Sequence, residues 1–222
     1  MIAKALRLIA GILLLPVVIG YSIAFAEQLL TVRRADSAEL LFLLGVTAYL
    51  AFHVLVAAPN RAYVFGHELT HAAAAWISGG KVKGFKVGAS KGSVTTNKIT
   101  AFISLAPYLI PVYAILWTLG FSLAGLFWST GRWVPVFLFG LGATLTFHLV
   151  FTVNVLKLKQ SDLEVVGPIL ALVLIVLANV TLVAGVMSLV TPEVRFSPYL
   201  ANGFHHTQEI YRAICAQLFV LR

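Results

Sequence analysis

The chain has 222 residues, of which 60% are hydrophobic and 11% are charged, with a formal net charge of +8. This composition excludes an ordinary soluble domain and makes lipid the solvent for most of the chain. The single cysteine, Cys215, excludes an internal disulfide and a thiolate zinc site, so a bound metal would need histidine and carboxylate ligands. The basic residues lie in short loops and form no aromatic-interleaved patch, so no nucleic-acid partner is expected.

In chain order, the apolar runs predict six membrane-spanning helices, because most reach the roughly 20 residues that a helix needs to cross a hydrocarbon core of about 30 Å. The expected spans are about 5–26, 38–58, 62–78, 100–127, 134–156 and 164–190. The predicted fold class is therefore all-α and polytopic, with a small β-hairpin after the third helix. We expect two helices in 1–58, a core in 59–190 and a tail in 191–222, with an amphipathic helix from about Thr207 to Val220.

The first apolar run, which follows Lys4 and Arg7, allows two interpretations. Its end at 24–26 has the A-x-A pattern of a cleaved secretory signal. Its length of about 19 residues exceeds a usual signal core of about 7–15 residues, which favours a retained helix.

The third run carries the sequence His67-Glu68-Leu69-Thr70-His71. At about 3.6 residues per turn, the two histidines project from one helical face and Glu68 lies at its flank. In this H-E-x-x-H arrangement, both imidazoles bind Zn²⁺ and the carboxylate activates water. Because charged groups within a span cost roughly 2.5–3.5 kcal/mol each on insertion scales, zinc binding is favoured over a structural polar cluster.

The loop after this helix is rich in glycine, lysine and β-prone residues. Gly79 and Gly80 are expected to end the helix, and β-prone residues on both sides of 88–92 predict a small hairpin. An exposed strand edge beside a catalytic centre can bind a peptide in extended form. The alternative is a polar connector whose lysines meet lipid head groups.

A catalytic zinc site usually needs a third protein ligand and an open position for water. The chain has only eight acidic residues, and most lie in the first loop or the tail. Two further spans separate the motif helix from Asp162, which returns the chain to the face of the lysine-rich loop. Asp162 is therefore the predicted third ligand, with Glu164 as the alternative. Bringing Asp162 to the histidines requires a tilt, a helix break near 157–161, or a re-entrant path at Pro107 and Pro111.

The basic loops predict the orientation in the membrane. In a six-span chain, three of these loops fall on one face, which the positive-inside rule makes cytoplasmic, and the amino terminus then lies outside. The basic residues of that face are Arg33, Arg34, Lys81, Lys83, Lys86, Lys91, Lys98, Lys157 and Lys159.

Four further histidines have simpler interpretations. His53 and His148 lie in apolar spans and could suggest a bis-histidine haem protein, but a lone histidine in a span more often bonds to a neighbouring helix. His205 and His206 lie in the tail, where a membrane-surface helix is favoured over a second metal site.

These motifs together resemble a known group, the site-2-protease-like intramembrane zinc metallopeptidases, and within it the short bacterial M50-like proteins. The resemblance is carried by the H-E-x-x-H helix, the loop that begins at Gly79 and Gly80, and Asp162 about 90 residues downstream. It covers roughly residues 60–170.

The family carries a later element, N-x-x-P-x-x-x-x-D-G, which this chain matches only in part. Asn154 precedes Asp162 by the expected eight positions, but Lys157 and Leu163 stand where the element has proline and glycine. The stretch 160–163 looks like the variant Ser/Thr-Asp element of the short M50-like proteins.

The resemblance implies one Zn²⁺ held by His67, His71 and Asp162, with Glu68 as general base and Asn154 assisting the substrate carbonyl. The implied reaction is hydrolysis of peptide bonds in membrane-embedded or juxtamembrane protein substrates, at a bacterial cytoplasmic membrane with the lysine-rich loop on the cytoplasmic side. The alternative is an inactive homologue that acts as a membrane-protein-binding scaffold or chaperone. The intact Glu68 favours catalysis, and the altered element favours the alternative. Neither the substrate's identity nor the oligomeric state can be predicted.

Overall fold

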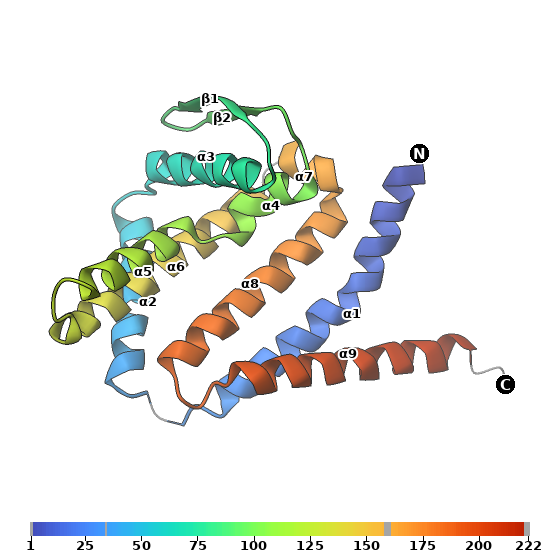
Figure 1. The fold of residues 1–222 in the computed structure, drawn as a ribbon. Helices are drawn as coiled ribbons and strands as arrows, with labels where there is room; N and C mark the ends of the chain where they lie inside the picture. Colours follow the sequence, from blue (N-terminus) through green and yellow to red (C-terminus); the bar gives the residue numbers. More distant parts are fainter. Residues whose placement is uncertain (1, 34, 158–160, 220–222) are drawn as a thin grey trace. The chain divides into compact units, whose positions relative to one another are not determined.

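The computed structural model describes residues 2–33, 35–157 and 161–219, which are mostly helical (Figure 1). Contacts within the chain define two compact units, Met1–Ala35 with Val166–Arg222, and Asp36–Val165. The elements in chain order are α1 (Ile2–Leu30), α2 (Ser37–Leu55), α3 (Asn60–Ile77), β1 (Val82–Val87), β2 (Gly92–Thr96), α4 (Ala101–Leu109), α5 (Val112–Gly125), the 3₁₀ turn η1 (Gly131–Trp133), α6 (Val134–Leu156), α7 (Ser161–Val166), α8 (Pro168–Val190) and α9 (Phe196–Phe219).

Four of the described helices, α1, α2, α6 and α8, are long and apolar enough to cross a membrane. Helices α4 and α5 add a fifth span if the bent pair counts as one. The prediction of a multi-pass, mostly helical chain is thus confirmed, and the described helices supply four or five candidate spans where about six were predicted. The difference lies in α3, because Asn60, Arg61 and the polar motif make its 18 residues too hydrophilic for a candidate span.

The span predicted over 100–127 is two helices that meet at an angle of 67°. Ile110 has extended backbone (φ −109°, ψ 110°), because the ring of Pro111 disfavours the helical conformation of the residue before it. The span predicted over 164–190 is also divided, since α7 ends at Val166 and Gly167 turns the chain with φ +98° before Pro168 begins α8.

The first unit consists of α1, α8 and α9, which pack through small residues around an aromatic cluster. Tyr199 is fully buried against Ala24 and Ala184, and Tyr21 meets its ring edge-on at 5.5 Å. The helix of the tail is longer than predicted, because it begins at Phe196. The predicted end at Val220 lies outside the described residues.

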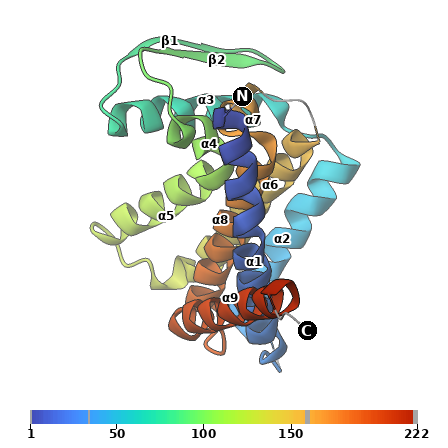
Figure 2. The same cartoon turned by 90° about the vertical axis from the view of Figure 1, so that its right-hand side faces the viewer.

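In the second unit, α2 and α6 lie side by side, as both views show (Figure 2). Their closest approach needs glycine on both helices. A Cβ at Gly45 would lie 1.9 Å from the Phe139 carbonyl oxygen, and one at Gly142 would lie 2.1 Å from that of Phe42. Such small-residue crossings allow backbones to touch where lipid supplies no hydrophobic driving force.

Helix α3 and the hairpin pack against each other at one end of this unit (Figure 1). Gly79 ends α3 in the left-handed region (φ +72°), and the Gly80 N–H donates to the Ala75 carbonyl at 2.7 Å. Val82 then packs on a buried cluster of Ala74, Ala75, Ile103 and Ala106. The antiparallel pairing of β1 with β2 confirms the predicted hairpin.

Candidate metal centre

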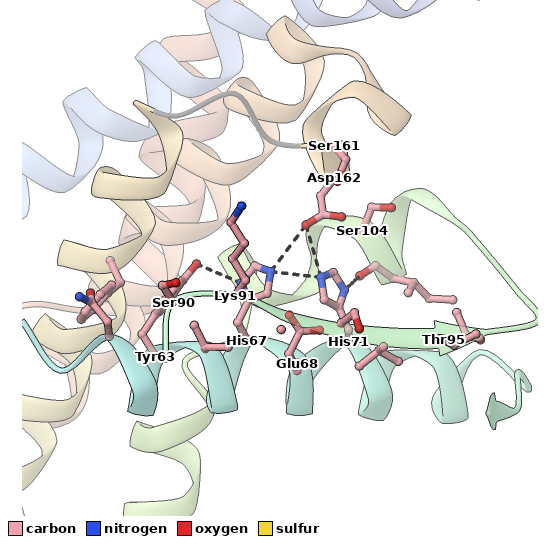
Figure 3. Close-up of a pocket in the computed structure, with 18 of the residues that line it drawn as sticks. Tyr63, His67, Glu68, His71, Ser90, Lys91, Thr95, Ser104, Ser161 and Asp162 are labelled. Carbon is pink, nitrogen blue, oxygen red and sulfur yellow. Dashed lines mark hydrogen bonds and ion pairs between the residues drawn. The ribbon is translucent and has the colours of Figure 1, made fainter. Parts of the chain in front are cut away.

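The side chains of His67, His71 and Asp162 converge on one point, although the aspartate lies about 90 residues after the histidines (Figure 3). Successive turns of α3 present the two imidazoles on one face, and the first turn of α7 supplies the carboxylate. Among the described residues, these three form the group that can hold a metal ion. The structure thus brings together the three predicted ligands.

The separations of the three ligand atoms fit a tetrahedral zinc site. His67 Nε2 lies 3.2 Å from His71 Nε2, and Asp162 Oδ2 lies 3.4 Å from His71 Nε2 and 3.6 Å from His67 Nε2. Nitrogen and oxygen ligands bind zinc at about 2.0–2.2 Å, which makes the edges of the coordination tetrahedron about 3.3–3.6 Å long. The donor set, two imidazoles and one carboxylate, is also one that zinc commonly takes in catalytic sites.

A tyrosine one helical turn before the motif orients His67. Tyr63 Oη lies 3.0 Å from His67 Nδ1, and the Tyr63 ring stacks on Phe151 of α6 with 4.4 Å between centroids and 6° between planes. The stacking fixes the phenol. When Nε2 of His67 binds a metal, its Nδ1–H donates to that phenol oxygen, as a second-shell partner of a ligating histidine commonly does.

A backbone carbonyl orients His71. His71 Nδ1 lies 2.8 Å from the Ile103 carbonyl oxygen, which can only accept, so Nδ1 carries the hydrogen and Nε2 presents its lone pair to the metal position. This carbonyl is available because Pro107, four residues on, has no N–H to donate to it. The Thr100 hydroxyl accepts a hydrogen bond from the Ile103 N–H at 3.2 Å and fixes the start of α4.

Asp162 is held by α4 as well as by the histidines. The hydroxyl of Tyr108, a fully buried residue, donates to Asp162 Oδ2 at 3.2 Å. Burial opposes ionisation of Asp162, but hydrogen bonds from His67 and His71 outweigh it and hold the pKa of the carboxyl well below its ordinary value. Glu164, the alternative ligand, is exposed and lies outside the metal-compatible group.

The three ligand residues line an open cavity of about 1050 Å³. Its wall also includes Glu68, whose side chain is directed into the cavity from the flank of the histidine face of α3 (Figure 3). Glu68 is only 6% exposed, and burial raises the pKa of its carboxyl above the ordinary value. Asn154 lines the cavity from α6, and Lys91 does so from the hairpin. A carboxylate beside the metal ligands is placed to exchange a proton with water in the cavity.

Some residues of the centre could not be found from the sequence. Tyr63 carried a weak signal, its position four residues before His67 on the same helical face. Tyr108 and the Ile103 carbonyl carried none, because their contacts depend on how α4 packs against α3 and α7. The two span histidines stand apart from the metal-compatible group, and His53 lies 3.1 Å from the hydroxyl of Tyr49 on its own helix.

Comparison of the chain with protein-family models, with curated proteins and with solved structures gives no match. The resemblance to intramembrane metallopeptidases therefore depends on the motifs alone. The geometry of the centre independently supports a possible metal ion at His67, His71 and Asp162.

Proposed function

We propose that this protein is a zinc endopeptidase of the site-2-protease type, which hydrolyses peptide bonds of membrane-embedded or juxtamembrane proteins. One observation carries the proposal: three ligand atoms at the edge lengths of a zinc tetrahedron share a cavity with the motif glutamate, Glu68. A purely structural polar cluster would need neither an open cavity nor a second carboxylate within it.

His67, His71 and Asp162 would hold the ion. Bound Zn²⁺ would supply a Lewis acid, which lowers the pKa of its water towards about 7 and stabilises negative charge that develops on the substrate. Glu68 would accept the proton of the attacking water and pass it to the leaving amine. Tyr63, the Ile103 carbonyl and Tyr108 would keep the ligands in place throughout.

The hairpin supplies a way to bind the substrate. Within the described residues, β2 pairs only with β1, so its other edge offers unpaired backbone groups. Residues of β2, including Ser93, Val94 and Thr95, line the cavity. An extended peptide that adds to this edge would enter the space beside the metal ligands. Asn154, on the α6 wall of the cavity, is the candidate for contact with the substrate carbonyl.

The revised span count changes the expected orientation. Among the described helices, α1 and α2 are the candidate spans that precede the hairpin, and two crossings return the chain to the face where it began. We therefore infer that the amino terminus, predicted outside from six spans, lies on the hairpin's face of the membrane. Lys4 and Arg7 then lie on the same side as the hairpin lysines, and the positive-inside rule makes that side cytoplasmic.

The deciding experiment compares purified wild type with Glu68→Gln. Elemental analysis should find about one zinc per chain in both proteins. Cleavage of fluorescently labelled casein, an unstructured protein, and of a panel of single-span reporter proteins should fall by about 10²–10⁴-fold in the variant, the usual contribution of a general base. Glu209→Gln, a charge-matched change at an exposed acid of α9, is the control and should leave both measurements unchanged.

Two outcomes would overturn the proposal. A wild type that binds no zinc would remove the metal centre. A wild type that binds zinc, cleaves none of the substrates and still captures single-span proteins would favour the inactive homologue that acts as a scaffold.

A further inference from the structure

The first residue of β2, Gly92, lies directly against Glu68. A Cβ at position 92 would be 2.5 Å from Glu68 Cγ, 2.7 Å from Glu68 Oε1 and 2.8 Å from Val64 Cγ1. Real Cβ atoms essentially never come within 3.0 Å of such neighbours. The hairpin backbone therefore occupies the space on one side of the glutamate, and only glycine leaves room for both.

Glycine is needed at this position for space and not for backbone conformation. Among the described residues, φ is positive only at Gly79 and Gly167, so Gly92 has a conformation that other residues adopt. Replacing it would impose no backbone strain. The change would act through the atoms that the new side chain meets.

The hairpin cannot easily move away to make room. The Gly88 N–H donates to the Lys91 carbonyl at 2.9 Å and closes the turn immediately before Gly92, which pairs with Val87. On the other strand, Val82 packs on the buried cluster beneath α3, and the Phe85 ring meets Phe65 of α3 edge-on at 6.2 Å. The Glu68 side chain is the softer partner and would be the one to shift.

We propose that Gly92 is a positioning residue: the main chain of β2 at this point confines the Glu68 carboxyl to the side of α3 that carries the metal ligands. The hairpin is then a working part of the catalytic centre, and not only a surface for substrate. This inference rests on the proposed function, because it assumes that Glu68 is the general base. Misplacing a catalytic group by about 1 Å can lower a rate by about 10²-fold.

The test compares Gly92→Ala with Gly84→Ala. Gly84 lies in the same hairpin, but a Cβ there would lie 3.4 Å from Thr95 Oγ1 and 3.6 Å from Thr95 Cβ, which is ordinary contact. Gly92→Ala should keep its zinc and lower kcat by about 10²-fold, whereas Gly84→Ala should change neither. If Gly92→Ala fails to fold, the double variant Val64→Ala/Gly92→Ala removes the clash with valine and retains the clash with Glu68.

A second readout does not depend on cleavage. In protein loaded with Co²⁺ in place of zinc, the pH at which the visible spectrum changes reports the environment of the metal's solvent ligand, which Glu68 influences. Gly92→Ala should shift this pH in the same direction as Glu68→Gln, and Gly84→Ala should leave it unchanged. A Gly92→Ala protein that matches Gly84→Ala in this titration overturns the inference. A wild type that binds metal but cleaves nothing would instead overturn the peptidase proposal, and the Co²⁺ titration would still decide the role of Gly92.

Discussion

Two helices of this chain, α3 and α9, each carry a pair of histidines near acidic residues, yet within the part of the chain that the structure describes only the α3 pair belongs to a group that can hold a metal ion. His67 and His71 are four residues apart and share a helical face, whereas His205 and His206 are adjacent and diverge by about 100° around α9. Their surroundings also differ. The side chains of the α3 pair are 12% and 13% exposed, and those of the α9 pair are 61% and 21% exposed.

The acidic partners follow the same division. On α3, a single oxygen of Asp162 faces both imidazoles. On α9, Glu209 also contacts both imidazoles, but through different oxygens: Oε1 lies 3.3 Å from His205 Nε2 and Oε2 lies 3.4 Å from His206 Nδ1. The Nε2 atom of His206 turns to a second carboxylate, Glu27 of α1, at 3.0 Å. Residue spacing and burial, and not the presence of histidine and acid, therefore separate a candidate metal centre from a set of surface ion pairs.

The largest effect should come from removing a ligand. Asp162→Ala and His71→Ala should each weaken zinc binding by more than about 100-fold, because a lost ligand should cost more than a lost second-shell partner, which costs about 10–100-fold. His206→Ala should leave zinc affinity unchanged. Competition with a chromophoric chelator measures these affinities. An equal loss of zinc affinity in His71→Ala and His206→Ala would contradict the distinction drawn between α3 and α9.

A smaller effect is expected from the phenols around the ligands. Tyr108→Phe removes the donor to Asp162, and Tyr63→Phe removes the partner of His67 Nδ1, so each should weaken zinc binding by about 10–100-fold. The matched control is Tyr211→Phe on α9, whose hydroxyl donates to the Leu13 carbonyl. If neither Tyr108→Phe nor Tyr63→Phe changes the affinity, the ligands are held by packing alone.

The smallest effect concerns the stability that an ion pair of α9 contributes, and how this stability depends on pH. The hydrogen bond to Glu27, with a further contribution from Glu209, raises the pKa of His206 above its ordinary value of 6.5. The ion pair therefore contributes its full stability below the unfolded-state pKa and loses it as the pH rises through the higher folded-state pKa. Across this range the melting temperature should fall by about 1–3 °C, as expected for an exposed ion pair in a chain of this size.

Thermal unfolding at a series of pH values measures this dependence, and Glu27→Gln should flatten it. A pH dependence that persists unchanged in Glu27→Gln would assign the effect to another group.

Local features of the fold could be predicted from the sequence. The four-residue spacing of His67 and His71 fixes their common face, and the glycines after α3 fix its end, because both depend on near neighbours in the chain. Asp162 could be predicted because the chain has few acids and the order of the spans limits which of them return to the motif helix. Glu68 followed from the motif itself.

Other features depend on contacts between residues far apart in the chain, which the local sequence pattern does not indicate. Helix α3 was predicted as a short span because its alanines resemble an apolar run, but Asn60, His67, Glu68 and His71 line the cavity. The predicted helix from about Thr207 starts later than α9, which begins at Phe196 and includes Pro198 and Gly203. Proline is tolerated in the first turn of a helix, and Gly203 is required where the Tyr21 ring packs on it, since a Cβ there would lie 2.7 Å from that ring.

The acceptor that holds His71 belongs to the main chain, and this limits how it can be detected. Substituting Ile103 leaves the carbonyl in place, so an alanine scan of α4 would pass over the contact. The informative position is Pro107, where any other residue would restore an N–H that competes for the same oxygen. Transplanting this centre into another scaffold would accordingly require the proline together with the three ligands.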